Sequence, residues 1–163
     1  MGSAVNPTDA LKCGLAAEVL RSLGELRLQV TGTSMIPAFW PGDVLLVRRE
    51  GATEVRAGDV ILFGRDERLF AHRVVRRAEG PGGPLWITRG DRNSHDDPPV
   101  SGEELLGRVT AVLRGDALVD PRPTLGLRMA AFFLRRSWAA TRLVVGLRRR
   151  WQGVALLTPP SPR

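Results

Sequence analysis

The residue best placed to do chemistry in this chain is Ser34, which lies in the turn-forming segment 31–43. Gly32 precedes it and Pro37 follows it, between two runs that have the pattern of β-strands. A serine hydroxyl on such a rigid turn can act as a nucleophile when a neighbouring base takes its proton. On its own Ser34 would be an ordinary turn residue, so the hypothesis depends on finding that base.

Few residues could serve as the base. The only lysine, Lys12, falls on an expected N-terminal helix outside the strand-rich part of the chain, which argues against a Ser–Lys dyad. The two histidines are His72 and His95. The strand-like run 70–75 would hold the His72 imidazole rigidly, as catalysis requires. His95 lies in a polar loop and is expected to face solvent. His72 is therefore the preferred base, and a core histidine without a catalytic role is the alternative.

Carboxylates that could orient the histidine lie in the polar loop 90–99. In a Ser-His-Asp arrangement an acid fixes the imidazole tautomer and stabilises the imidazolium. The loop offers Asp91, Asp96 and Asp97, and their spacing does not choose among them. Asp91, Asn93 and Asp96 superficially suggest a calcium loop, but the glycine at position six and the terminal glutamate of such a loop are absent. We therefore expect no metal, and no other cofactor.

The elements expected to position these residues are mostly β-strands. Apolar runs separated by Gly, Pro and Asp turns predict six short strands, at 26–30, 44–47, 60–63, 69–77, 85–88 and 105–113. The pairs Gly42-Asp43 and Gly58-Asp59 are interpreted as turns. One short helix is expected at about 9–23, with Thr8 as its N-cap. We predict a mostly β fold with three parts: an N-terminal helix in 1–24, a core in 25–115, and a basic amphipathic helix in 116–163.

The composition fits one globular domain with an appendage. Hydrophobic residues make up 43% of the 163 positions, which is ordinary for a folded domain. The single cysteine, Cys13, excludes an internal disulfide and a Cys-based metal site. No apolar run reaches the ~20 residues that a membrane span needs, and the N-terminus lacks the pattern of a secretory signal. We therefore expect a cytoplasmic protein, with peripheral attachment to the membrane as the open question.

That question arises because the basic charge is confined to the C-terminal third. Residues 1–113 carry 14 basic and 15 acidic side chains, whereas residues 114–163 carry 10 and 2. Four arginines recur every seven residues and would lie along one line of a helix: Arg128, Arg135, Arg142 and Arg149. Such a helix could pack its Phe and Trp side chains on the core, or lie in an anionic membrane interface. Nucleic-acid binding is not expected, because no recognised module is present.

Five short motifs follow one another along the strand-rich part of the chain. They are Ser34-Met35-x-Pro37-Ala38-Phe39-x-x-Gly42-Asp43, Gly58-Asp59-Val60-Ile61-x-Phe63, His72-Arg73-Val74, Thr88-Arg89-Gly90-Asp91-x-Asn93-x-x-Asp96-Asp97 and Gly107-Arg108-Val109. In this order they resemble the type I signal peptidases over about residues 28–113. The chain is most similar to the endoplasmic-reticulum and archaeal branch, in which histidine replaces the lysine of the common bacterial enzymes. The resemblance implies the signal-peptidase and LexA-like β core.

The resemblance also implies a serine endopeptidase that removes a signal or leader peptide from a precursor. Ser34 would be the nucleophile and His72 the general base. The acid of the family corresponds best to Asp97, with Asp91 and Asp96 as secondary candidates. Related enzymes prefer small side chains before the scissile bond.

The chain departs from the family pattern at two places. Many signal peptidases carry a serine two positions before the nucleophile, where this chain has Gly32. The oxyanion would then be held by the Ser34 backbone N–H and a second donor, for which Thr33 is a candidate. Relatives on the secretory pathway also have a membrane-spanning helix before the Ser-Met motif, where this chain has a short charged helix. A cytosolic precursor is therefore the expected substrate, unless a partner localises the protein.

Two other functions remain as alternatives. A non-catalytic peptide-binding or assembly module could use the same fold, although it would not need the serine, the histidine and the aspartate together. A self-cleaving repressor of the LexA-like kind would need an N-terminal DNA-binding domain. About 25 residues precede the expected core, which is too few for such a domain.

Overall fold

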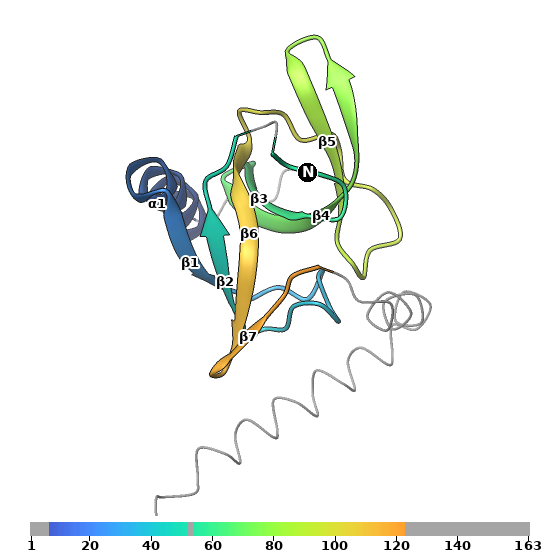
Figure 1. Ribbon diagram of the computed structural model, residues 1–163. Helices are drawn as coiled ribbons and strands as arrows, with labels where there is room; N and C mark the ends of the chain where they lie inside the picture. The colour runs from blue at the N-terminus through green and yellow to red at the C-terminus, as the bar shows by residue number, and fades with distance from the viewer. Residues whose placement is uncertain (1–6, 52–53, 123–163) are drawn as a thin grey trace, which may run out of the picture.

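The structure is a computed structural model that describes residues 7–51 and 54–122. Within these residues the chain forms one helix and seven strands, α1 (Pro7–Leu23), β1 (Glu25–Gln29), β2 (Val44–Arg48), β3 (Val60–Arg65), β4 (Arg68–Gly80), β5 (Gly83–Arg89), β6 (Leu105–Arg114) and β7 (Ala117–Val119). The predicted mostly β fold with a short N-terminal helix is confirmed (Figure 1). The expected basic helix, with Arg128, Arg135, Arg142 and Arg149, lies outside the described residues.

All the strands belong to one antiparallel sheet in the order β1-β2-β6-β3-β4-β5, with β7 paired to β6. Gly42 and Gly58 precede β2 and β3 with φ values of 95°, a conformation that favours glycine, which explains the two Gly-Asp turns. Strand β7 extends the sheet to residue 119, beyond the expected end of the core at residue 115.

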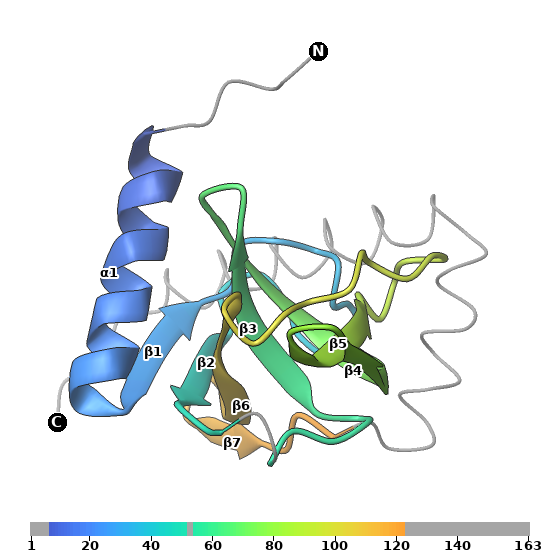
Figure 2. The same ribbon diagram turned by 90° about the horizontal axis from the view of Figure 1, so that it is seen from above.

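The sheet is strongly curved, and its curvature brings distant loops together (Figures 1 and 2). Register shifts interrupt three strand pairs: β2 with β6, β3 with β6, and β4 with β5. Such bulges bend a strand and increase its twist. As a result, the segment after β1 and the loop after β5 both reach the middle of β4.

The core consists of two groups of buried side chains. The larger group lies under β1, β2, β3 and β6 and includes Leu20 of α1. The smaller group surrounds Trp86 of β5, which is fully buried. Because Ala16 and Leu20 are buried, α1 packs on the sheet beside β1, as Figure 2 shows, and is part of the same folded body. Its outer face leaves Leu11 and Leu15 exposed.

Candidate active site

A serine, a histidine and an aspartate far apart in the sequence meet at the middle of β4. The Nε2 atom of His72 lies 2.9 Å from the Oγ atom of Ser34. On the other side of the ring, Nδ1 lies 2.7 Å from Oδ2 of Asp97. The imidazole is buried, with 6% of the residue exposed, so both ring nitrogens are committed to these two partners. The contacts form one continuous line from hydroxyl to carboxylate.

The segment that carries Ser34 is a compact series of turns pinned at its far end. Local bonds, such as the one from Phe39 N–H to the Met35 carbonyl at 3.0 Å, shape the turns. Asp43, which is 3% exposed, accepts the Trp40 N–H at 2.8 Å. Arg114 of β6 donates to the Asp43 carboxylate at 2.7 Å and to the Ala38 carbonyl at 2.8 Å. Asp43 therefore does more than form the turn inferred from the sequence, since it anchors the serine segment to the sheet.

The loop after β5 packs directly against this segment. The Arg92 N–H donates to the Ser34 carbonyl at 2.9 Å. A Cβ atom on Gly90 would lie 2.8 Å from the same carbonyl oxygen, so only glycine permits the approach. Asp91 accepts two hydrogen bonds from Arg73, at 2.8 and 2.7 Å. Asp91 thus ties the loop to β4.

Asp97 is the aspartate of the loop that reaches the histidine. Its N–H donates to the Thr88 carbonyl at 2.8 Å. Its Oδ2 atom also accepts the Thr88 hydroxyl at 2.7 Å. Burial raises the pKa of Asp97, but the hydrogen bonds from His72 and Thr88 outweigh this and hold it below its ordinary value. Asp97 is therefore a carboxylate at neutral pH.

The other predicted residues of this region lie elsewhere. Asp96 forms an ion pair with Arg89 at 3.1 Å. His95 is exposed, and its Nδ1 atom is 2.8 Å from the hydroxyl of Ser94. The residue that sequence reasoning missed is Thr88, which is fully buried and holds the carboxylate. Its place in the Thr-Arg-Gly-Asp motif was the only signal for it.

The groups around the serine include one clear donor for an oxyanion. Within the described residues, the Ser34 backbone N–H makes no hydrogen bond. The hydroxyl of Thr33 accepts a hydrogen bond from Arg92 Nη1 at 3.5 Å. A Cβ atom on Gly32 would meet nothing within 4 Å, so there is space for the serine that many signal peptidases carry there.

A cleft of about 730 Å³ opens beside the Ser34–His72 pair. It is lined by the segment 28–33 and by the start of β4, residues 68–72. Apolar side chains of the core line it further, among them Met35, Phe39, Leu45 and Leu62. Lys12 of α1 also lines the cleft but makes no hydrogen bond with Ser34, whose hydroxyl contacts His72. No group of His, Cys, Asp and Glu side chains in the described part of the chain could hold a metal ion.

Comparison with known proteins identifies the family. Residues 14–108, more than half of the chain, match the model of the family described as peptidase S24-like. The chain belongs to the peptidase S24-like family. This S24-like chain is also similar to catalytic subunits of signal peptidase complexes, which confirms the resemblance to the signal peptidases and to their endoplasmic-reticulum branch.

Three relatives show the extent of this similarity. Sec11 of Pyrenophora tritici-repentis is 37% identical over 90 residues, which cover 52% of this chain and 51% of the relative. SEC11 of Eremothecium gossypii is 40% identical over 91 residues, covering 53% and 50%. Human SEC11C is 38% identical over 72 residues, covering 42% and 37%. The chain thus spans about half or less of the length of these relatives. No helix in the described ranges is long and apolar enough to cross a bilayer.

Proposed function

We propose that this S24-like protein is a serine endopeptidase of the signal-peptidase type, acting through Ser34, His72 and Asp97. The observation that carries the proposal is the unbroken line of contacts from the serine hydroxyl through the imidazole to the carboxylate, at 2.9 and 2.7 Å. This is the geometry by which a weak hydroxyl nucleophile is activated. The similarity to signal peptidase catalytic subunits supports the same reaction.

Each group has a role in the proposed reaction. His72 Nε2 takes the proton of the Ser34 hydroxyl as its oxygen attacks the scissile carbonyl. Asp97 accepts the Nδ1–H and stabilises the imidazolium that forms. The Ser34 N–H faces the oxyanion of the tetrahedral intermediate, where a positioned donor is worth roughly 10²–10³ in rate. His72 then returns the proton to the leaving amine, and a water molecule deacylates Ser34 with the same base.

The substrate best suited to the cleft is an extended peptide. Segments 28–33 and 68–72 both line the cleft, and they lead to the two reacting groups, Ser34 and His72. An extended peptide in such a cleft can use its backbone for hydrogen bonds and its side chains for contacts with the apolar lining. We propose a precursor carrying a signal or leader peptide with small side chains before the scissile bond. We propose that this precursor is cytosolic, and the peptides cleaved in the experiment described next would test this.

Cleavage of a proteome-derived peptide library by the purified full chain tests the proposal. New N-termini would be identified by mass spectrometry for the wild type and for Ser34→Ala. We expect a discrete set of cleavages after small residues that disappears in the variant. Identical cleavage patterns in the two proteins would refute the mechanism. No cleavage by either protein would instead favour a non-catalytic peptide-binding module.

A further inference from the structure

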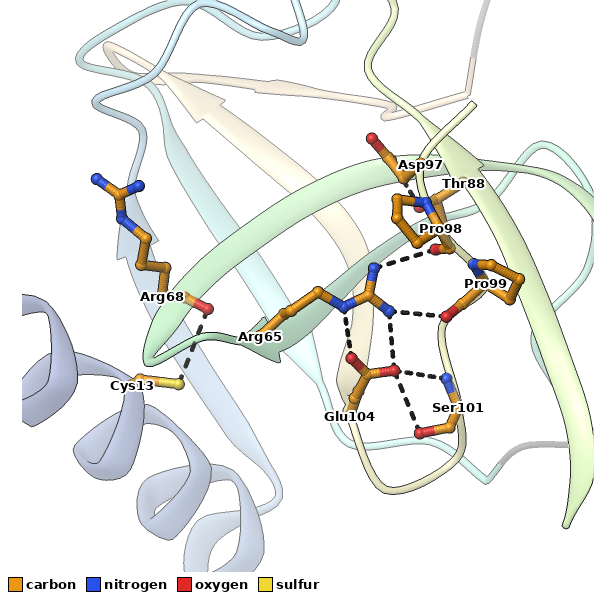
Figure 3. Close-up of polar contacts among 9 residues, drawn as sticks. All are labelled: Cys13, Arg65, Arg68, Thr88, Asp97, Pro98, Pro99, Ser101 and Glu104. Atoms are coloured by element: carbon orange, nitrogen blue, oxygen red, sulfur yellow. Dashed lines mark hydrogen bonds and ion pairs between the residues drawn. The ribbon is translucent and has the colours of Figure 1, made fainter. Parts of the chain in front are cut away.

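The two residues after Asp97 are prolines, which limits the hydrogen bonds that can hold this segment in place. Pro98 and Pro99 have no backbone N–H, so only their carbonyls can be anchored. Both carbonyls accept hydrogen bonds from Arg65, which lies at the end of β3. Nη1 donates to the Pro98 carbonyl at 3.1 Å and Nη2 to the Pro99 carbonyl at 2.7 Å (Figure 3). Among the described residues, Arg65 is the only source of hydrogen bonds to this pair.

The flanking anchors lie on either side of the proline pair. Before it, the Asp97 N–H donates to the Thr88 carbonyl at 2.8 Å. After it, Val100 and Trp86 exchange two backbone hydrogen bonds of 2.9 Å. Residues 97–100 therefore form a strap whose ends are hydrogen-bonded to β5 and whose middle is hydrogen-bonded to Arg65. The carboxylate of Asp97 lies at the start of this strap.

Arg65 is itself fixed in place. Its Nε and Nη2 atoms donate to the two carboxylate oxygens of Glu104, at 2.6 and 2.9 Å. Glu104 in turn accepts the N–H of Ser101 at 2.9 Å and its hydroxyl at 3.2 Å (Figure 3). The guanidinium carbon lies 5.6 Å from the ring centroid of Phe63. Only 20% of the Arg65 side chain and 26% of the Glu104 side chain are exposed. A planar fork is required to make these four bonds together, and lysine has none.

The charge of Arg65 also favours the ionised form of Asp97. Its positive charge helps to lower the pKa of Asp97, after the effects of burial and of the hydrogen bonds from His72 and Thr88. Arg65 does not line the cleft beside Ser34, so it would not touch a peptide bound there. An influence of Arg65 on the reaction is therefore indirect, and its hydrogen bonds to the segment that follows Asp97 are the most direct route.

We propose that Arg65, locked by Glu104, is a positioning residue that fixes Asp97 toward Nδ1 of His72. The role of Arg65 in catalysis rests on the proposed function, but its effect on the geometry of Asp97 and His72 can be measured without turnover. Removing the fork frees both proline carbonyls and lets the strap shift. A displacement of about 1 Å in a reacting constellation can cost on the order of 100-fold in rate.

Histidine NMR tests the positioning directly. The full chain has two histidines, so ¹⁵N-histidine labelling gives two sets of imidazole signals, and His95→Gln assigns them. We expect the His72 Nδ1 proton of the wild type to resonate far downfield, as a proton shared with a carboxylate does. In Arg65→Met it should move toward the position of a free imidazole, with a smaller shift in Arg65→Lys. Arg76→Met, which changes an exposed arginine on the neighbouring strand β4, is the matched control and should change nothing.

An unchanged His72 signal in a folded Arg65→Met protein would overturn the proposal. Should Arg65→Met fail to fold, Glu104→Gln decides the matter, because it preserves the shape of the network and weakens the lock. A shift of the same sign supports the proposal, and a wild-type spectrum contradicts it. Because this readout needs no substrate, it stays valid even if Ser34→Ala shows that the protein is not a peptidase.

A kinetic cycle then tests whether the effect on the reaction passes through Asp97. We expect Arg65→Met to lower kcat roughly ten- to hundredfold with little change in KM, because Arg65 lies outside the cleft. In an Asp97→Asn background the same substitution should have almost no further effect. Equal fold-losses in both backgrounds would show that Arg65 acts independently of Asp97, which contradicts the positioning role.

Discussion

Replacing Thr88 by valine should weaken the site and the fold in a pH-dependent way. The Thr88 hydroxyl is fully buried and donates to Asp97 Oδ2 at 2.7 Å, the same oxygen that faces His72. Valine has nearly the same shape but no donor. A hydrogen bond to a charged group contributes about 1.5–3 kcal/mol to stability, so the free energy of unfolding at pH 7 should fall by about that amount.

The sign of the pH dependence follows from the lowered pKa of Asp97. Its hydrogen bonds stabilise the folded state above the ordinary pKa of an aspartate, about 3.9. This contribution is lost as the pH falls through the lower, folded-state pKa. The difference in stability between wild type and Thr88→Val should therefore be largest near neutral pH and shrink as Asp97 becomes protonated in both proteins.

Urea denaturation of both proteins at several pH values between 7 and 2.5 would measure this difference. Thr110→Val is the matched control, because the Thr110 hydroxyl is exposed and donates to the neutral carbonyl of Leu46 at 3.1 Å. Its effect should be smaller and nearly independent of pH. A Thr88→Val effect that is below about 0.5 kcal/mol, or constant with pH, would refute the assignment of Thr88 as a partner of the Asp97 carboxylate.

Three further predictions test other parts of the molecule. Gly32→Ser should leave the melting temperature unchanged, because the site has space, and should raise the rate of peptide cleavage by supplying a second oxyanion donor; a lower rate would contradict this. Asp43→Ala should cost about 3–5 kcal/mol in urea denaturation by leaving Arg114 unpaired against the serine segment, and a loss below 1 kcal/mol would show that the pair anchors little. Deleting residues 123–163 should abolish sedimentation with anionic liposomes while peptide cleavage survives. Pro121 is kept, because its carbonyl accepts a hydrogen bond from Arg73. Unchanged sedimentation would contradict a role of the C-terminal segment in membrane contact.

The elements of the fold could be predicted because each has a local signature. Apolar alternation and Gly-Asp turns located six strands, and helical spacing located α1 to within two residues of its start. Strand β7 escaped because it is three residues long and two of them are exposed, so it has no apolar pattern. The packing of α1 along the cleft also escaped, since it depends on Ala16 and Leu20 meeting the sheet rather than on any local pattern.

Residue types and the order of the motifs predicted only part of the candidate site. The choice of Asp97 rested on resemblance, because three aspartates in one loop are equivalent by spacing, and only the three-dimensional path of the strap brings one of them to His72. Thr88 is one of two threonines in the described strands, and no local pattern distinguishes it from Thr110. Arg65 and Glu104 are 39 positions apart and share no motif, so nothing but the fold pairs them.

The central claim is that His72 activates Ser34 for attack on a peptide carbonyl. Intact-mass and peptide mapping of the protein after incubation with a peptide thioester, followed by an acid quench, measures this most directly. The account predicts an acyl group on Ser34 in the wild type, formed at least a hundredfold more slowly in His72→Ala, on the order expected for loss of a general base. Acylation of Lys12 or Cys13 instead, or a Ser34 rate that is unchanged in His72→Ala, would contradict it.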